Sequence, residues 1–249
     1  MTCLLAIDTA TGDATVAVAV SEDPGDLDGR KVFSRSWFSQ HNHGVELMPK
    51  INEALDAAGL AIPDLTDIAV VIGPGSFSAL RVGLATAQGM ALASGLRLTP
   101  VPTFEVEIEP WADHDGPVCA AIDAGSSGLA WGLYLAAENG RQDGLQNELR
   151  LESIGVDPPG ACVEACPDTT VFCGESAQKF TGLVPRARIL SGEAPTRGAD
   201  ALVQIALRRL ANGEARDPSE VEITYARAPT ITTPSERLPG GSRTQRAPG

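Results

Sequence analysis

A glycine-rich turn at residues 73–75 is the part of the sequence whose residue types are best suited to bind a ligand. An apolar run, 68–72, precedes it and small residues follow from 76 to 95, so the order predicts a buried strand, a tight turn and a helix. The free amides and the dipole at the start of a helix favour an anion. The turn matches neither a P-loop nor G-x-G-x-x-G. We predict phosphate contacts at Gly73, Gly75 and Ser76, with a turn that binds nothing as the equal alternative.

Two aspartates, Asp8 and Asp123, hold equivalent places in a weak internal repeat. Residues 4–20 and 119–135 each read as an apolar strand, an Asp, a small polar turn and an alternating strand, which is typical of a β-hairpin. Turns that face each other between two lobes would suit a phosphate or Mg²⁺, contacted by Asp8, Thr9 and Thr11 and by Ser126 and Ser127. The favoured alternative is that both aspartates end strands and accept turn amides.

Catalytic and metal-binding constellations are missing from the sequence. The three histidines, His41, His43 and His114, include no pair four residues apart that could share a helical face as metal ligands. A G-x-S-x-G nucleophile elbow is also absent. Cys162 and Cys166 could share a helical face, but zinc needs four ligands and no histidine lies near them. We therefore expect no metal site, and interpret these cysteines as buried structural thiols.

The elements that must position these residues form two βββαβα units. This pattern predicts an α/β fold of two similar lobes, with mixed sheets flanked by helices. The first lobe is predicted at 1–101 and the second at 102–227, with the last helix as a candidate to pack back on the first lobe. The tail 228–249 lacks periodicity and is predicted to be disordered. The elements predicted outside the hairpins are strands 31–39 and 148–154 and helices 44–59, 76–95 and 199–212.

Composition excludes several classes of protein. The chain has 249 residues, of which 43% are hydrophobic and 20% charged, as expected for a globular protein. Its net charge of −13 disfavours direct binding to nucleic acid over a broad surface. The N-terminus does not read as a signal peptide, and no apolar run approaches the roughly 18–20 residues of a membrane span. An odd count of five cysteines argues for reduced thiols, so we expect a cytoplasmic protein with no membrane contact.

The helix predicted at 76–95 has small residues on more than one side. Leu80, Leu84, Ala87 and Ala91 form one apolar stripe, so the residues off that stripe indicate a second packed face. We expect this face and helix 44–59 to form a partner surface. Arg81 could pair with a carboxylate of the partner or of its own chain. The predicted interface residues are Val45, Met48, Ile51, Leu55, Arg81, Val82, Gly83, Thr86, Gly89 and Met90.

Taken together, four motifs of the chain resemble the TsaB (YeaZ) family of bacterial tRNA threonylcarbamoyladenosine (t6A) biosynthesis proteins. They are AIDTAT at 6–11, HGVELMP at 43–49, GPGSFSALRVGLATAQGMA at 73–91 and ITYAR at 223–227. The chain departs from the family at Ser78 and Ala79, where GPGSFTGLR is usual. It departs again at Asp123-Ala124-Gly125-Ser126, where the family has an Asp-Ala-Arg-like sequence. The resemblance implies a duplicated actin/Hsp70-like (ribonuclease H-like) fold.

The resemblance also implies a partner role. TsaB-like proteins are scaffolds or activators that pair with a catalytic TsaD-like subunit and are joined by the ATPase TsaE. It implies no intrinsic cofactor, ATP or ADP at the complex interface, contact with tRNA only through the complex, and a homodimer when the chain is alone. TsaD-like chains carry an H-x-x-x-H metal pair, which this sequence lacks. The alternative is an actin-fold ATP-dependent kinase or metallopeptidase-like enzyme, for which 173–182 is only a faint nucleotide motif.

Overall fold

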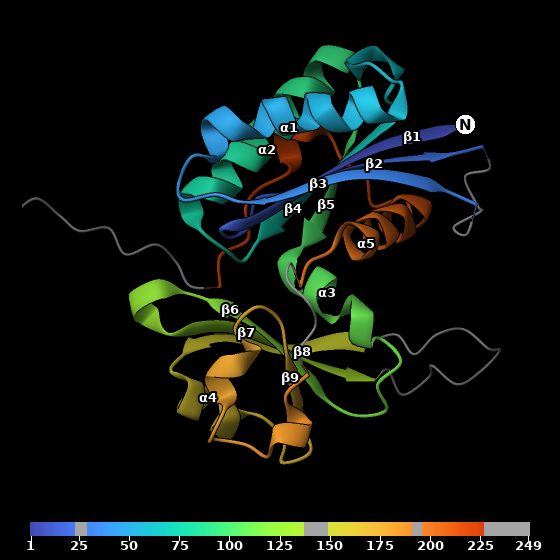
Figure 1. Ribbon diagram of the computed structural model, residues 1–249. Coiled ribbons are helices and arrows are strands. Elements are labelled where there is room, and N and C mark those ends of the chain that lie inside the picture. Colours follow the sequence, from blue (N-terminus) through green and yellow to red (C-terminus); the bar gives the residue numbers. More distant parts are fainter. Residues whose placement is uncertain (23–28, 137–148, 191–195, 227–249) are drawn as a thin grey trace, which may run out of the picture.

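The computed structural model describes residues 1–22, 29–136, 149–190 and 196–226, which form two lobes, each built on its own sheet (Figure 1). The first sheet has the strand order β3-β2-β1-β4-β5, and the second has the order β8-β7-β6-β9. The first sheet consists of β1 (Thr2–Asp8), β2 (Asp13–Ser21), β3 (Lys31–Phe38), β4 (Asp67–Gly73) and β5 (Leu98–Pro102). The second consists of β6 (Val118–Asp123), β7 (Leu129–Ala136), β8 (Leu149–Asp157) and β9 (Val171–Cys173).

Five α-helices flank these sheets in the described part of the chain, and none of them is both long and apolar enough to cross a membrane. They are α1 (His43–Ala58), α2 (Phe77–Ser94), α3 (Thr103–Ile108), α4 (Pro159–Ala165) and α5 (Ala199–Ala211). The helices α1 and α2 end at Gly59 and Gly95, whose φ angles of 70° and 68° are left-handed. Glycine is the residue that adopts this helix-ending conformation without strain.

The internal repeat is visible in the strand pairing. β1 pairs antiparallel with β2 and parallel with β4, and β6 pairs in the same way with β7 and β9. The local geometry repeats too. Asp8 Oδ1 accepts the amide of Ala10 at 2.8 Å, and Asp123 Oδ1 accepts the amide of Gly125 at 2.7 Å. The two aspartates therefore end equivalent strands and accept turn amides, as the favoured reading of the sequence expects.

The first sheet is buried on both faces, and helices cover it from either side (Figure 1). Residues alternate between the faces of a strand, so Leu5 and Ile7 of β1 face one layer and Leu4 and Ala6 face the other. Leu5 and Ile7 pack in one cluster with residues of α1 and α2, whereas Leu4 and Ala6 pack with Leu202 and other residues of α5. The last helix of the chain thus completes the core of the first lobe.

The chain passes between the lobes at the junction of β5 and α3. β5 ends at Pro102 and α3 begins at Thr103, which puts α3 between the two sheets (Figure 1). Phe104 and Ile108 pack in the core of the second lobe, and Val106 packs in the cluster that contains α5. The short helix α3 therefore contributes side chains to the cores of both lobes. The tail predicted at 228–249 lies outside the described residues.

Candidate functional site

The glycine turn after β4 packs against other parts of the same chain. A Cβ atom at Gly73 would lie 2.3 Å from the carbonyl oxygen of Thr224, and one at Gly75 would lie 2.3 Å from that of Ala10. The amide of Ser76, just before α2, donates to the same Ala10 oxygen at 2.6 Å. These glycines are required for close backbone packing, and the amide of Ser76 is used inside the chain.

Asp8 and Thr9 are also committed to internal hydrogen bonds. Asp8 is fully buried. Its Oδ2 accepts the Nε–H of Arg197 at 2.7 Å, and its Oδ1 accepts the backbone amide of Ala10 in the turn. The hydroxyl of Thr9 donates to the carbonyl of Ala79 in α2 at 2.8 Å. The phosphate contacts expected at these two residues would therefore have to displace bonds that stabilise the fold.

Arg197, which precedes α5, lies at the junction of the lobes with only 2% of its surface exposed. Besides Asp8, its guanidinium donates to Glu107 Oε1 at 2.7 Å, to Glu175 Oε2 at 3.3 Å and to Thr11 Oγ1 at 2.5 Å. Asp8 and Thr11 come from the first lobe, Glu107 from α3 and Glu175 from the loop after β9. We call these five residues the Arg197 cluster. It joins both lobes through one buried cation.

The two hairpin turns do converge, but on a carboxylate of the chain itself. Glu175 Oε2 accepts the hydroxyl of Thr11 at 2.8 Å, and Glu175 Oε1 accepts the amide of Asp123 at 3.3 Å. The side chain of Asp123 is exposed and pairs with Lys179 at 3.0 Å. The expectation that the two aspartates flank one shared site is therefore wrong, because Asp8 is buried against Arg197 and Asp123 faces solvent.

Burial and charge act in opposite directions on the ionisable groups of the Arg197 cluster. Burial raises the pKa of Glu107 above its usual value, and the nearby Arg197 only partly offsets this effect. Burial disfavours the charged form of Arg197, but Asp8, Glu107 and Glu175 outweigh it and raise the pKa of the guanidinium. Glu107 Oε2 has no hydrogen-bond partner within the described structure. Arg197 thus stays charged, and the buried Glu107 takes a proton more readily than an ordinary glutamate.

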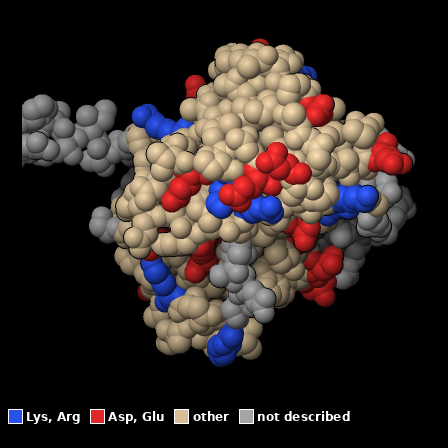
Figure 2. Space-filling view, turned by 45° about the horizontal axis from the view of Figure 1, so that its top comes forward, with Lys and Arg blue, Asp and Glu red and all other residues tan. Residues whose placement is uncertain are grey.

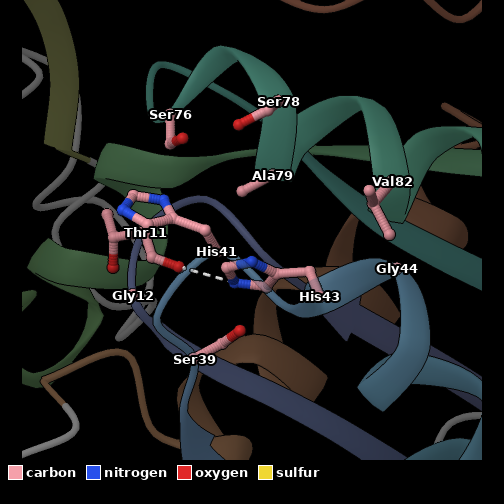
Figure 3. A pocket seen from close by; sticks show the side chains of 10 residues that line it. All are labelled: Thr11, Gly12, Ser39, His41, His43, Gly44, Ser76, Ser78, Ala79 and Val82. Atoms are coloured by element: carbon pink, nitrogen blue, oxygen red, sulfur yellow. Dashed lines mark hydrogen bonds between the residues drawn. The ribbon is translucent and has the colours of Figure 1, made fainter.

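A pocket of about 150 Å³ lies beside this cluster, between the starts of α1 and α2 (Figure 3). His43 is buried there and its Nε2 bonds to the carbonyl of Thr11 at 3.0 Å, whereas His41 is exposed and has a left-handed φ of 75°. Pockets for drug-sized ligands measure roughly 300–1,000 Å³. This pocket is therefore too small for a nucleotide. It is lined by Thr11, Gly12, Ser39, His41, His43, Gly44, Ser76, Ser78, Ala79 and Val82.

The outer face of α1 and α2 exposes apolar side chains. Val45 is 75% exposed, Met48 36%, Phe77 42% and Leu92 64%. Figure 2 shows that charged side chains of both signs form a band across this view, with a largely uncharged surface above it. A groove of about 440 Å³ runs between α2 and residues 221–225. Four further residues expected at a partner surface are exposed or half-buried, namely Arg81, Val82, Thr86 and Gly89 of α2.

Four predicted interface residues lie instead in the core of the chain. Ile51, Leu55 and Met90 are at most 8% exposed and pack with the first sheet. Gly83 is buried too, and a Cβ atom there would lie 2.3 Å from Thr9 Oγ1. These residues belong to the apolar stripes of α1 and α2, and the apolar stripe of an amphipathic helix faces the core of its own chain. We remove these residues from the interface.

Arg81 forms a contact that the sequence did not indicate. Its guanidinium carbon lies 3.9 Å from the centre of the Phe77 ring, and that ring stacks on Tyr225 at 5.5 Å. Such a cation–π contact contributes about 0.5–1 kcal/mol at an exposed site. The stack of Phe77 on Tyr225 joins the segment around Tyr225 to the start of α2.

The five cysteines are all buried and free, and three of them gather in the second lobe. Cys119 of β6 joins Cys162 and Cys166, with the three sulfur atoms within 4.8 Å of one another. The sequence showed the spacing of Cys162 and Cys166 but not Cys119, which lies 43 residues before Cys162. Arg197, Glu107 and Glu175 were missed in the same way, because single charged residues far apart carry no pattern.

Two lobes with the same strand pairing, each a mixed sheet flanked by helices, define an actin-like (ribonuclease H-like) fold. The solved structure "YeaZ from Pseudomonas aeruginosa" matches with a TM-score of 0.72 and 25% identity, covering 90% of this chain and all of that one. A second YeaZ-like structure from Pseudomonas aeruginosa matches with a TM-score of 0.73 and 24% identity, covering 91% of this chain and all of that one.

Sequence comparison agrees. The tRNA threonylcarbamoyladenosine biosynthesis protein TsaB of Escherichia coli is 27% identical over 237 residues, covering 90% of this chain and 94% of that protein. TsaB of Haemophilus influenzae is 32% identical over 123 residues, 49% of each chain. In these matches and in its fold, the chain is similar to proteins of the TsaB (YeaZ) family.

Related transferases match a shorter part of this chain. A family model described as TsaD, tRNA N6-adenosine threonylcarbamoyltransferase, matches residues 37–151. A transferase of that name from Anaeromyxobacter dehalogenans is 36% identical over 121 residues, which is 42% of this chain and 34% of that protein. This chain therefore aligns with about a third of the length of that relative.

Proposed function

We propose that this chain is a non-catalytic scaffold or activator subunit in the biosynthesis of t6A in tRNA, paired with a catalytic TsaD-like subunit and joined by a TsaE-like ATPase. The chain acts in the cytoplasm and contacts tRNA through the complex. It has no cofactor of its own, and ATP or ADP binds at the interface of the complex. Without its partner it forms a homodimer through the same surface.

The Arg197 cluster is the observation that carries this proposal. A two-lobed fold offers its natural reaction site between the lobes, where the two hairpin turns converge. In this chain Arg197 and Glu175 fill that junction, with donor–acceptor distances from 2.5 to 3.3 Å. A substrate or a catalytic ion would have to displace a buried guanidinium that bonds to three carboxylates, at a cost of several kcal/mol.

The exposed face of α1 and α2 supports the partner role. Large apolar side chains on neighbouring helices are the usual centre of a protein interface, and the rim is usually polar. Val45 and Met48 of α1 lie on this face with Phe77 and Leu92 of α2. Glu53, paired with Lys50 and Arg35, supplies charge on the outer side of α1.

A second candidate function is catalysis of threonylcarbamoyl transfer by this chain itself. The match of residues 37–151 to the transferase family favours it. The absence of a histidine pair four residues apart speaks against it, since the sequence has only His41, His43 and His114. The two candidates differ in one property, which is whether the chain alone transfers the group.

The partner surface is tested by Gly89→Glu, because a Cβ atom at Gly89 meets nothing within 4 Å and the fold should tolerate it. The matched control is Ala57→Glu, an exposed position on α1 that lies on the opposite side of the helix from Met48. We expect Gly89→Glu to elute as a folded monomer and to lose co-elution with the TsaD-like subunit, while Ala57→Glu behaves as wild type. If both folded variants bind the TsaD-like subunit equally well, the interface lies elsewhere on the chain.

A further inference from the structure

Three buried thiols of the second lobe form a cluster that the proposed function does not use. Cys119 and Cys162 are fully buried and Cys166 is 8% exposed. The sulfur atoms of Cys119 and Cys162 are 3.9 Å apart, and all three sulfur atoms lie within 4.8 Å of one another. The other two cysteines, Cys3 and Cys173, are buried outside this group. The chain thus contains a three-thiol cluster and two matched cysteines outside it.

Two adjacent elements bring the thiols together. Cys119 lies on the face of β6 that packs in one cluster with Cys162 and Cys166, while its neighbours Val118 and Ala120 face the opposite cluster. Cys162 and Cys166 are four residues apart along α4 and its end, so their side chains project from the same side. A central strand and its covering helix are a rigid support, and ligands on such elements are better positioned than ligands on loops.

The sulfur separations match those of a metal–thiolate centre. With metal–sulfur bonds of about 2.3 Å, thiolates around one ion lie roughly 3.8–4.0 Å apart in tetrahedral to trigonal geometry. Cys119 and Cys162 already stand at 3.9 Å. The third sulfur, within 4.8 Å of both, needs a movement of roughly 1 Å, which a small change of its side-chain torsion supplies.

The chemistry of the three side chains also suits a soft cation. Thiolate is the form of cysteine that binds metals. Cys119, Cys162 and Cys166 place three sulfur atoms close enough together to bind one ion, whereas Cys3 and Cys173 lie outside this group.

We propose that Cys119, Cys162 and Cys166 bind one thiophilic ion with a filled d shell, either Cu⁺ held by three sulfurs or Zn²⁺ with a fourth, non-cysteine ligand. Soft thiolate donors select these ions over hard cations such as Mg²⁺ and Ca²⁺. This proposal revises the expectation of no metal site, which considered the histidine spacing and the pair Cys162 and Cys166 but not Cys119. The site lies in the second lobe, remote from the α1–α2 face, and is independent of the proposed function.

The test begins with full-length wild type, reduced, stripped with a chelator and desalted. Separate samples receive Zn²⁺ or glutathione-bound Cu⁺, are desalted again, and have their metal content measured by mass spectrometry. We expect one equivalent of at least one ion in wild type and a loss of at least tenfold in Cys162→Ala and Cys166→Ala. The controls Cys3→Ala and Cys173→Ala should retain the full equivalent.

The X-ray absorption of the loaded wild type provides a readout that does not depend on the variants. We expect a sulfur shell at about 2.3 Å from the metal, with three sulfurs for Cu⁺ or three sulfurs and one lighter atom for Zn²⁺. Circular dichroism first establishes that each variant is folded. Uptake of neither ion by wild type, a shell without sulfur, or full retention by Cys162→Ala would each overturn the proposal.

Discussion

Arg197 links more segments than any other side chain of the interlobe junction. It bonds to Asp8 and Thr11 in the first lobe, Glu107 in α3 and Glu175 in the second lobe. A buried ion pair contributes little when compared with apolar residues of the same volume, but removal of one partner leaves uncompensated charge. The importance of Arg197 therefore lies in the carboxylates that it neutralises.

Replacing Arg197 with Met should lower the free energy of unfolding by about 3–5 kcal/mol, because Asp8 and Glu107 would remain buried without a counter-ion. Urea unfolding followed by circular dichroism measures this change. Arg150→Met is the control, since the side chains of Arg150 and its partner Glu152 are 74% and 45% exposed and its loss should cost at most about 1 kcal/mol. Equal effects of the two substitutions would contradict this account of the junction.

Glu107 should make a measurable contribution to the pH dependence of stability. Its pKa in the folded chain is raised by burial above the usual 4.5, so the folded state binds its proton more tightly than the unfolded state. The stability it contributes is present below pH 4.5 and is lost as pH rises through the folded pKa. The unfolding free energy of wild type minus that of Glu107→Gln should therefore fall with rising pH in this window. A difference that rises would show that Arg197 lowers the pKa of Glu107 instead.

The sequence predicted some of these residues and not others, for physical reasons. Asp8 and Thr11 could be found because a repeated hairpin marks its turns. Arg197, Glu107 and Glu175 could not, since their proximity depends on how the two lobes meet. The assignment of Ile51 and Leu55 to an interface was wrong because an apolar stripe does not itself say whether the chain or a partner covers it.

Among the elements, the long helices were the most predictable. α1, α2 and α5 lie within a residue of their predicted ends, since an apolar period of 3.6 is distinct over a dozen residues. β5, with the sequence LTPVP, was missed because proline within an apolar run argues against a strand. α3, with the sequence TFEVEI, alternates like a strand, and its helical form depends on packing between the lobes.

The two glycines of α2 provide a test of which side of the helix faces its own core. A Cβ atom at Gly83 would lie 2.3 Å from Thr9 Oγ1, whereas one at Gly89 would meet nothing within 4 Å. Gly83→Ala should lower the unfolding free energy by about 1–3 kcal/mol through overpacking. Gly89→Ala should raise it by up to about 1 kcal/mol, the difference in helix propensity. Urea unfolding of both variants measures these two changes. Changes in unfolding free energy of the same sign would contradict this orientation of α2.

In the whole molecule, the core of each lobe contains residues of a helix that follows the other lobe's sheet along the chain. α3 follows the first sheet and contributes Phe104 and Ile108 to the second core, and α5 follows the second sheet and covers the first. The sequence made the last helix a candidate to pack on the first lobe, but its apolar face alone is compatible with either sheet.

Residues 1–101 alone should therefore fail to fold stably, since Leu4, Ala6 and Val71 would lose the cover that α5 gives them. Joining residues 198–226 to this fragment through a flexible linker should restore a cooperative urea transition. Circular dichroism and urea unfolding of both fragments measure the difference. Equal stability of the two fragments would mean that α5 is dispensable for the first lobe.

The central claim is that this chain promotes t6A formation without performing the transfer. Its most direct test is a reconstitution of this chain with unmodified tRNA, threonylcarbamoyl-adenylate, ATP, a TsaD-like and a TsaE-like subunit. One protein is omitted at a time, and t6A is measured by mass spectrometry. We predict t6A in the complete mixture, none with this chain alone, and a strong decrease when this chain is omitted or replaced by Gly89→Glu. Formation of t6A by this chain without the TsaD-like subunit would contradict the account.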